Sequence, residues 1–240
     1  MDPRLTIIDE RLSRIKRIIA IASGKGGVGK TLISSLMALI LSKRNFRVGL
    51  LDLDFHGPSC HIVLGARDIE FVEEKGVIPP LIHGIQFMSI VHFAKDSPVP
   101  LRGKEVSNAI IELLAITRWG DLDYLIIDLP PGMGDEALDT IRLIKRGEFT
   151  IVTTPSVLSI NVVRRLVLLL RKIKVNITGI IENMRLKENT LIEEFARENK
   201  IRYLGYIPFD TNVDAFIGSP EKLIRTSFGM KLSEIIKGIE

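Results

Sequence analysis

Gly24-Lys25-Gly26-Gly27-Val28-Gly29-Lys30-Thr31 is the stretch of sequence that decides the fold. It satisfies the pattern G-x-x-x-x-G-K-[ST] and carries an additional lysine directly after its first glycine. An apolar, β-branched run at 18–22 precedes it, and apolar residues at helical spacing follow it over 32–40. This order of strand, loop and helix is the context in which the pattern forms a phosphate-binding loop.

Each residue type in this stretch has a role in phosphate chemistry. Glycines let backbone N–H groups converge on phosphate oxygens, and the helix that follows presents its positive end. Lys30 is expected to neutralise charge on the β- and γ-phosphates, and the Thr31 hydroxyl to bind Mg²⁺. The sequence therefore predicts a site for ATP with Mg²⁺, formed by Gly24, Lys25, Gly26, Gly27, Val28, Gly29, Lys30, Thr31 and Leu32.

The same letters admit a second interpretation. Gly24-x-Gly26-x-x-Gly29 also fits the dinucleotide fingerprint, and Asp52 or Asp54 lies near the place where a ribose-binding acid would sit. Lys30-Thr31 favours the triphosphate, because a site that binds pyrophosphate through the backbone needs neither residue. An NAD-binding oxidoreductase of the Rossmann type stays as an alternative.

Composition limits the classes of protein and partner. The 240 residues are 46% hydrophobic, and 33 basic residues against 29 acidic ones give a net charge of +4. The excess is small and spread along the chain, so we expect no nucleic-acid or membrane partner. Cys60 is the single cysteine, which excludes an intramolecular disulfide. The first residues alternate charged with apolar side chains, and we expect a cytoplasmic protein.

Short apolar runs alternate with amphipathic segments, which is typical of an α/β fold with a mainly parallel sheet flanked by helices. We predict one doubly wound domain of the P-loop NTPase type over 17–240, and a helical N-terminal extension over 1–16. Strands are predicted at 17–22, 48–53, 85–91, 124–128, 150–154, 177–182 and 202–206. Helices are predicted at 31–44, 105–118, 135–145, 159–172, 189–199 and 220–239, while 77–81 is a short strand or a loop.

Carboxylates end two of the predicted strands. Asp52 and Asp54 follow one apolar run, and Asp128 ends another. The carboxyl ends of parallel strands border the ligand crevice, so these acids are expected to meet at the phosphate-binding loop. We assign Asp128 and Asp52 to Mg²⁺ through water, and Asp54 to the water that attacks the phosphate. The alternative for each is a cap on the following helix or loop.

Two further groups of residues lie close to these acids in the sequence. The segment Leu129-Pro130-Pro131-Gly132-Met133-Gly134 combines rigid prolines with flexible glycines. It is expected to act as a switch that senses the γ-phosphate through Pro131, Gly132 and Gly134, or to be a rigid turn. His56, Cys60 and His61 carry zinc or iron ligand types, but we favour a small buried cysteine beside surface or turn histidines.

These motifs together resemble the Mrp family of deviant Walker A ATPases, which is related to MinD, ParA and the nitrogenase iron protein. The resemblance covers nearly the whole chain from Arg17 onward. It is carried by the phosphate-binding loop, and by the segments Asp52-Leu53-Asp54-Phe55-His56-Gly57-Pro58-Ser59, Arg102-Gly103, Trp119-Gly120, Asp123-Tyr124-Leu125-Ile126-Ile127-Asp128-Leu129-Pro130-Pro131-Gly132, Thr153-Thr154-Pro155 and Glu182-Asn183-Met184.

The resemblance implies a homodimer that holds two ATP molecules between its subunits and hydrolyses them. In that arrangement Lys25 reaches the nucleotide of the partner, and Lys30 serves its own subunit. Lys25, Lys30 and Asp54 are then the catalytic residues. Asn183 matches the position that contacts the adenine edge, and Pro208 and Asp210 match a further contact to the base.

The chain departs from the family pattern after Met184. Family members that carry an iron–sulfur cluster have a Cys-x-x-Cys shortly after this point, whereas this chain continues without cysteine. We therefore expect no cluster of its own, and a role in iron–sulfur assembly that depends on a protein partner or cargo. The alternative is a positioning ATPase of the MinD or ParA type that binds membrane or DNA.

Overall fold

The computed structural model describes residues 2–66, 70–91 and 103–240. Its centre is an eight-stranded sheet in the order β10-β9-β8-β1-β7-β2-β6-β5. Neighbouring strands run parallel, except that β5 pairs with β6 in the antiparallel sense. The strands are β1 (Ile15–Ser23), β2 (Val48–Asp52), β5 (Leu81–Ile82), β6 (Ile85–Ser89), β7 (Leu122–Asp128), β8 (Gly147–Thr153), β9 (Asn176–Arg185) and β10 (Tyr203–Pro208). Strands β3 (Val72–Glu73) and β4 (Val77–Ile78) form a separate antiparallel ribbon.

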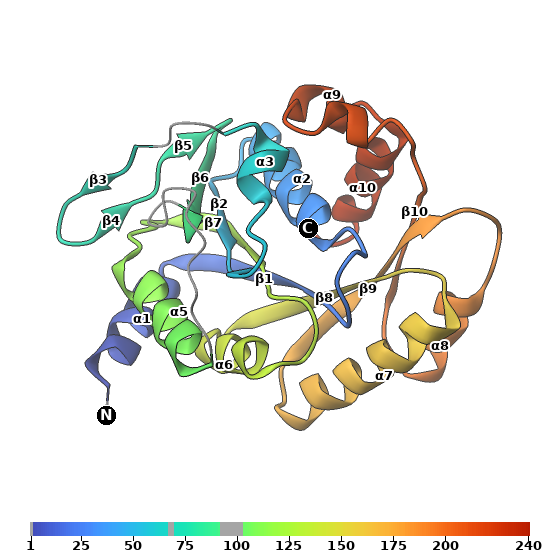
Figure 1. The fold of residues 1–240 in the computed structure, drawn as a ribbon, viewed down its shortest axis with the longest axis horizontal. Helices are drawn as coiled ribbons and strands as arrows, with labels where there is room; N and C mark the ends of the chain where they lie inside the picture. The colour runs from blue at the N-terminus through green and yellow to red at the C-terminus, as the bar shows by residue number, and fades with distance from the viewer. Residues whose placement is uncertain (1, 67–69, 92–102) are drawn as a thin grey trace.

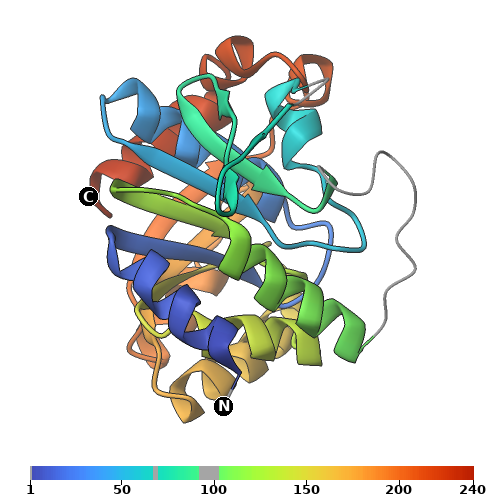
Figure 2. The ribbon, with the colours of Figure 1, turned by 90° about the vertical axis from the view of Figure 1, so that its left-hand side faces the viewer.

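Helices cover both faces of the sheet (Figures 1 and 2). One layer contains α1 (Pro3–Ser13), α5 (Lys104–Ile116), α6 (Asp135–Leu143), α7 (Val157–Lys172) and α8 (Leu191–Glu198). The other contains α2 (Lys30–Lys43), α3 (Cys60–Leu64), α9 (Pro220–Ile224) and α10 (Ser227–Lys237), with the short 3-10 helix η1 (Asp214–Phe216) beside α9. The predicted α/β class with a mainly parallel sheet between helices is confirmed.

The central strand β1 shows how the sequence builds the two layers. Ile18 and Ala20 belong to the hydrophobic core under α1, α5 and α7, whereas Ile19 and Ile21 belong to the core under α2 and α10. Successive side chains of a strand point to opposite faces, so an unbroken apolar run fills both cores. The strand is buried on both sides and brings its carboxyl end to the phosphate-binding loop.

The structure differs from several of the predicted elements. The helix predicted at 220–239 is wrong, because the chain breaks between α9 and α10, where Thr226 Oγ1 accepts a hydrogen bond from the Gly229 amide and starts a new helix. Helix α3 was not predicted, since five residues are too few for a periodic pattern. Strand β9 runs to Arg185, so Asn183 lies within a strand rather than after it.

The N-terminal residues form α1 and then lead directly into β1 at Ile15, within the segment assigned to the extension. Asp2 caps the helix by accepting a hydrogen bond from the Arg4 amide. Ile8 and Leu12 are buried in the core that lies under α5. At the other end of the chain, α10 buries Phe228, Leu232, Ile235 and Ile236 against its own sheet and α2.

A search of the described residues for a helix that is both long and apolar enough to cross a membrane finds none.

Candidate nucleotide-binding site

The loop at 24–29 leaves the carboxyl end of β1 and enters α2 at Lys30. Gly27 and Gly29 have φ of +74° and +84°, a left-handed conformation that favours glycine. Apart from the adjoining residues of the loop, no atom of the described residues lies within 4 Å of the place where a Cβ of Gly26 or Gly27 would be, so this part of the loop faces open space. It thus offers exposed backbone amides at a helix N-terminus, which is the arrangement that binds phosphate.

The carboxylate of Asp128, at the end of β7, contacts the polar residues at the start of α2. Its Oδ2 accepts a hydrogen bond from Thr31 Oγ1 at 2.7 Å, and its Oδ1 accepts one from Ser34 Oγ at 2.7 Å. Lys30 Nζ lies 2.8 Å from Oδ1 as an ion pair, with no well-aligned hydrogen bond to any described residue. Asp128 and Lys30 are buried, so this charge pair lies in a region of low dielectric.

Asp52 lies beside Asp128, because the two residues pair across the parallel strands β2 and β7. Its Oδ2 accepts hydrogen bonds from the amides of Ser59 and Cys60, each at 3.1 Å, at the start of α3. Burial, and then the charge of Asp128, raise the pKa of Asp52 to about 7. Two buried, charged carboxylates whose oxygens lie within 4.8 Å of each other repel each other. A cation between them offsets this repulsion.

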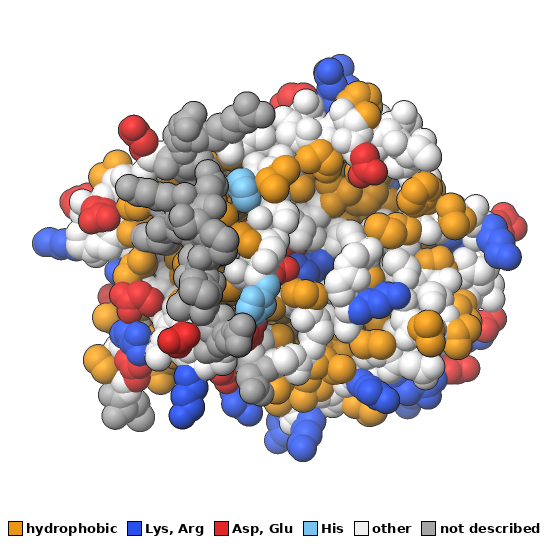
Figure 3. Space-filling view, in the orientation of Figure 1, with side chains coloured by type: hydrophobic (Ala, Val, Ile, Leu, Met, Phe, Trp, Pro, Cys, Tyr) orange, Lys and Arg blue, Asp and Glu red, His pale blue; other side chains and the backbone are white. Residues whose placement is uncertain are grey.

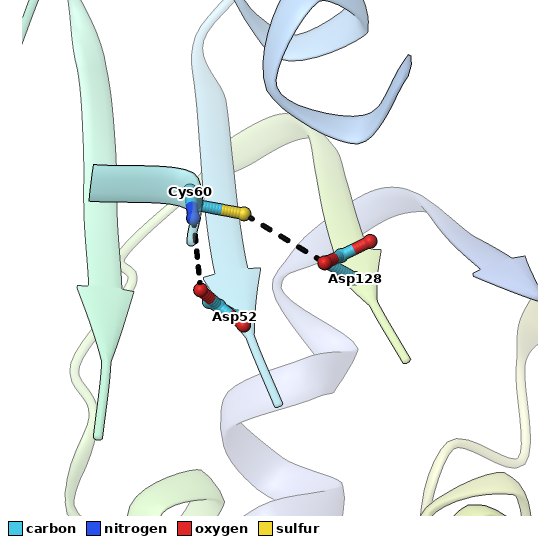
Figure 4. Close-up of side chains that lie close together, drawn as sticks. All are labelled: Asp52, Cys60 and Asp128. Carbon is cyan, nitrogen blue, oxygen red and sulfur yellow. Dashed lines mark hydrogen bonds between the residues drawn. The ribbon is translucent and has the colours of Figure 1, made fainter. Parts of the chain in front are cut away.

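Cys60 completes this buried cluster, with Sγ 3.9 Å from Asp128 Oδ2 (Figure 4). Ligand atoms of Asp52, Cys60 and Asp128 all lie within 4.8 Å of one another. Within the part of the chain that the structure describes, neither His56 nor His61 belongs to this cluster, and exposed His56 pairs with Glu136 at 3.1 Å. His56, Cys60 and His61 are therefore not brought together as a metal site.

Asp54 follows β2 and lies at the edge of the same site. It is half-buried, its amide donates to Asp52 Oδ1, and its Oδ1 accepts from the Gly57 amide at 3.1 Å. The carboxylate therefore caps its own loop through Oδ1, which is the alternative role expected for this residue. Among the described residues its Oδ2 makes no hydrogen bond, and the assignment to the attacking water stays a prediction.

The segment after Asp128 is attached to the end of β1. The Gly132 amide donates to the Ser23 carbonyl at 3.0 Å, and Gly132 has φ of +86°. Pro131 is exposed, and Gly134 precedes the first turn of α6. Gly132 therefore lies beside Ser23, the residue before the phosphate-binding loop, and the role of Pro131, Gly132 and Gly134 as a switch stays a prediction.

Asn183 reaches the loop from β9. Its Nδ2 donates to the Val28 carbonyl at 2.8 Å, while its Oδ1 is buried and has no hydrogen-bond partner among the described residues. A Cβ at Gly29 would lie 2.2 Å from Asn183 Nδ2, so only glycine fits there. The side chain thus supports the loop and leaves one acceptor unused.

Pro208 and Asp210 lie at the end of β10, next to β9. Pro208 pairs with Arg185, two residues beyond Asn183. Asp210 accepts hydrogen bonds from Ser227 Oγ at 2.7 Å and from the Asn212 amide at 2.9 Å. These bonds, that from the Ser227 hydroxyl first, lower the pKa of Asp210 to about 2. Its carboxylate anchors the start of α10 and lines a pocket of about 390 Å³.

Lys25 differs from Lys30 in its burial and in its contacts. It is exposed, and in the chain as described its side chain makes no hydrogen bond or ion pair, although its carbonyl accepts from Ser23 Oγ. Leu32 is half-buried in the first turn of α2, and Val28 is buried under the loop. The loop therefore has one inward lysine and one that faces solvent.

Sequence reasoning missed Ser34 and Glu182, and it grouped Cys60 with two histidines rather than with Asp52 and Asp128. Ser34 shares a helix face with Lys30 and Thr31 at i, i+4 and i, i+3 spacing, a signal that was available. Cys60 enters the site because α3 places it over Asp52, which no local pattern indicated. Glu182, fully buried beside Asn183, accepts hydrogen bonds from Tyr203 and Asn189 and supports the end of β9.

The fold and this loop define a P-loop NTPase of the deviant Walker A class, in which a second lysine follows the first glycine. The family model described as NUBPL iron-transfer P-loop NTPase, of the ParA type, matches residues 14–239. The chain belongs to this family, and the resemblance seen in the sequence is confirmed. The family gives no support to the dinucleotide interpretation.

Relatives carry the name iron–sulfur cluster carrier protein. The one from Rickettsia conorii is 43% identical over 182 residues, which are 75% of this chain and 57% of the relative. The one from Mycobacterium tuberculosis is 32% identical over 251 residues, which cover 94% of this chain and 65% of the relative. The chain thus spans less than two thirds of the length of these relatives.

Solved structures with this fold hold nucleotide. A nucleotide-binding protein from Archaeoglobus fulgidus, in complex with ADP and with cobalt found in it, is 32% identical with a TM-score of 0.76. The match covers 98% of this chain and 93% of that one. MinD from Pyrococcus horikoshii, complexed with Mg-ADP, has a TM-score of 0.72 at 19% identity, with 93% and 96% coverage. The second likeness shows the fold alone.

The raised pKa of Asp52 predicts that, without nucleotide or metal, the free energy of unfolding depends on pH. Unfolded Asp52 loses its proton near pH 3.8, whereas the folded carboxyl keeps it to about pH 7. Wild-type stability relative to Asp52→Asn should therefore fall as pH rises through this window, by at least about 1 kcal/mol. Urea unfolding in EDTA at a series of pH values measures this difference.

Asp123→Asn is the matched control. Asp123 lies at the other end of the sheet, where Lys16 and then Arg47 lower its pKa. The Asp123 carboxylate stabilises the fold above its unfolded pKa, and this stabilisation is lost only as pH falls. The difference in free energy of unfolding between the wild type and Asp123→Asn should therefore stay constant from about pH 5 to about pH 7. A flat Asp52→Asn difference over the same range would contradict the placement of Asp52.

Proposed function

We propose that this chain is a Mg²⁺-dependent ATPase that works as a homodimeric switch in iron–sulfur cluster assembly or transfer. One observation carries the proposal. Buried Asp128 holds Lys30, Thr31 and Ser34 at the mouth of a glycine loop that faces open space. A buried lysine without a well-aligned acceptor, next to free loop amides, is suited to triphosphate oxygens.

The residues present fit Mg²⁺. Thr31, Asp52 and Asp128 supply a hydroxyl and two carboxylates, the hard oxygen donors that this ion prefers, and the repulsion between the buried acids favours a cation. When bound, Mg²⁺ would draw negative charge from the phosphate oxygens. The thiol of Cys60 is a softer donor in the same cluster, and it distinguishes this site from an all-oxygen one.

Hydrolysis needs a water placed against the terminal phosphorus. In the proposed reaction the water oxygen bonds to the γ-phosphorus, the bond to the β–γ bridging oxygen breaks, and ADP and phosphate leave. Asp54, half-buried at the edge of the site, would orient the water and accept its hydrogen bond. Lys30 would stabilise the charge on its own phosphates.

Lys25 is one argument for the proposed homodimer. It is exposed and points to no partner in its own described chain, and a second cation at the terminal phosphate does what an arginine finger does. Figure 3 shows acidic and basic side chains close together near the centre of one face, with hydrophobic side chains around them. Leu158, in the first turn of α7, is 75% exposed, and Leu186 and Phe209, directly after β9 and β10, are 80% and 51% exposed. Such a surface suits burial against a second copy.

The nucleotide base is proposed to bind beyond the loop, at the ends of β9 and β10. Asn183 Oδ1 is a buried acceptor that has no partner among the described residues, and it would take a hydrogen bond from the exocyclic amine of adenine. Pro208 and Asp210 lie on the neighbouring strand end. Because Asp210 already holds the start of α10, we assign it to shaping the base site rather than to a direct contact.

The cargo is inferred from the relatives named iron–sulfur cluster carriers. Between Met184 and the start of α8 the chain reads Arg185-Leu186-Lys187-Glu188-Asn189-Thr190, so thiolates are absent where the family pattern would place them. Cys60 is fully buried against Asp128 and does not replace them. We therefore propose that the ATP state recruits a partner that supplies the cysteines.

Mixing two inactive variants tests the dimer and both catalytic assignments. Lys25→Ala removes a group that acts in the partner's site, whereas Asp54→Ala removes one that acts in its own. A mixed dimer then has one site with both defects and one intact site. Equal mixing should restore about one quarter of wild-type ATPase activity, because about half of the dimers are mixed and each has one working site.

The matched control is a mixture of Lys30→Ala with Asp54→Ala. Both groups act in their own subunit, so each site of the mixed dimer keeps one defect and no activity returns. Recovery in this control, or none in the Lys25→Ala mixture, would contradict the proposed roles.

The cluster proposal is tested by anaerobic reconstitution with iron and sulfide, followed by desalting. With one cysteine per chain, the protein should retain no chromophore in the region of thiolate-to-iron charge transfer, at about 400 nm. Retention of about one cluster per dimer, lost in Cys60→Ser, would show that the protein carries a cluster directly.

A further inference from the structure

The exposed face of α7 is a part of the fold that the nucleotide site does not use. The helix lies on the outside of its layer, beside α8 (Figure 1), and its sequence contains no acidic residue. Leu168 is 61% exposed, and its neighbours one turn before and one turn after it are exposed cations. Arg164, Arg165, Leu168, Arg171 and Lys172 are here called the α7 patch. The patch has an apolar centre within a ring of four positive charges.

The four charges of the α7 patch are not paired within the fold. In the part of the chain that the structure describes, no carboxylate forms an ion pair with any of them. Arg164 lies 5.7 Å from the centre of the Phe195 ring, and Arg171 donates to the Asn199 carbonyl. These contacts hold two guanidinium groups against α8 and leave their charge in place. Basic side chains gather along the lower edge of the face in Figure 3, the edge at which α7 lies in Figure 1.

Helix α8 is the neighbour that could offset this charge. It exposes three carboxylates, those of Glu193, Glu194 and Glu198, beside one cation, Arg197. Glu194 accepts a hydrogen bond from Thr190 at 2.7 Å, within its own helix. Among the described residues none of the three carboxylates pairs with the α7 patch. Helix α8 therefore screens the patch from one side and leaves its four charges available to a partner.

Helix stability accounts for only half of these cations. Arg171 and Lys172 lie in the last turn of α7, where positive charge interacts favourably with the helix dipole. Arg164 and Arg165 lie in the middle of the helix, where alternating charges one turn apart would stabilise it better. A leucine at the centre of unpaired cations matches the anatomy of a protein interface, in which a charged rim surrounds an apolar contact.

The α7 patch lies apart from the proposed dimer surface, and its helix contacts the phosphate-binding loop. Leu158 of the dimer surface precedes Leu168 by ten residues, which is about 15 Å along the helix. Between them, Val162 packs against the loop, since a Cβ at Gly24 would lie 2.8 Å from Val162 Cγ1. A partner on the patch would therefore bind a helix that touches the nucleotide site without covering that site.

We propose that the α7 patch docks a protein partner through an acidic amphipathic helix. Carboxylates of the partner pair with the four cations, and an apolar side chain of the partner covers Leu168. That this is the partner recruited in cluster transfer rests on the proposed function, whereas the docking chemistry does not. A nucleic acid would use the cations and leave Leu168 exposed, and a membrane surface needs a wider apolar face than one leucine.

Three short helical peptides test both parts of this chemistry. The Glu/Leu peptide has glutamate on one face and leucine on the other; one twin has glutamine for each glutamate, and a second has alanine for each leucine. Binding of each labelled peptide to the full chain is measured by fluorescence anisotropy without nucleotide, so the result is independent of ATP hydrolysis. The Glu/Leu peptide should bind at least about tenfold more tightly than either twin, and added salt should weaken it.

Arg165→Glu and Leu168→Gln should each weaken binding of the Glu/Leu peptide by at least about fivefold, because one reverses a charge of the ring and the other removes its apolar centre. Both residues are exposed, so the fold should tolerate the changes, which circular dichroism checks. Lys237→Glu on α10 and Leu81→Gln on β5 are the matched controls. They make the same kinds of change at exposed positions of other elements and should alter the affinity less than about twofold.

Two kinds of result would overturn the proposal. One is equal binding of the three peptides, or no saturable binding of the Glu/Leu peptide. The other is unchanged affinity in folded Arg165→Glu or in folded Leu168→Gln, which would place the docking elsewhere. A DNA duplex or phosphatidylglycerol vesicles that bind more tightly than the Glu/Leu peptide, and lose this binding in Arg165→Glu, would assign the patch to nucleic acid or to membrane instead.

Discussion

The carboxylate of Asp128 is the group on which the arrangement of the nucleotide site depends. It ends the central strand β7 and accepts from Thr31 and Ser34 while pairing with Lys30. A buried carboxylate without such partners would cost several kcal/mol, so the strand end and the first turn of α2 fix each other. The loop between them can then keep its amides free, because the elements on either side hold it in shape.

This constraint was visible in the sequence only in part. The glycine loop and the apolar runs ending in Asp52 and Asp128 were enough to predict the sheet, the loop and their meeting point, since strand periodicity and the open α/β topology fix them. The tertiary contacts were not predictable. Helix α3 is too short to show a pattern, and it alone brings Cys60 over Asp52. The break before α10 depends on one threonine cap within an otherwise helical run.

The two lysines of the loop explain how one sequence motif can serve a switch. Lys30 is buried and committed to its own subunit, whereas Lys25 is exposed and lacks a partner among the described residues. In the proposed homodimer Lys25 acts in the site of the second subunit, so the active state would depend on association. In our proposal the missing cysteine pair after Met184 separates ATP hydrolysis from direct cluster binding, although the chain belongs to a family named for iron transfer.

ATP binding by Lys30→Ala, measured by isothermal titration calorimetry in the presence of Mg²⁺, tests the central claim most directly. Lys43→Ala is the matched control, because Lys43 ends the same helix and pairs with Glu221 on the surface. Lys30→Ala should lose ATP affinity by at least about a hundredfold, since it removes a charge-assisted contact in a low-dielectric loop. Lys43→Ala should bind as the wild type does. Near-normal affinity in folded Lys30→Ala would contradict the assignment of this loop as the triphosphate site.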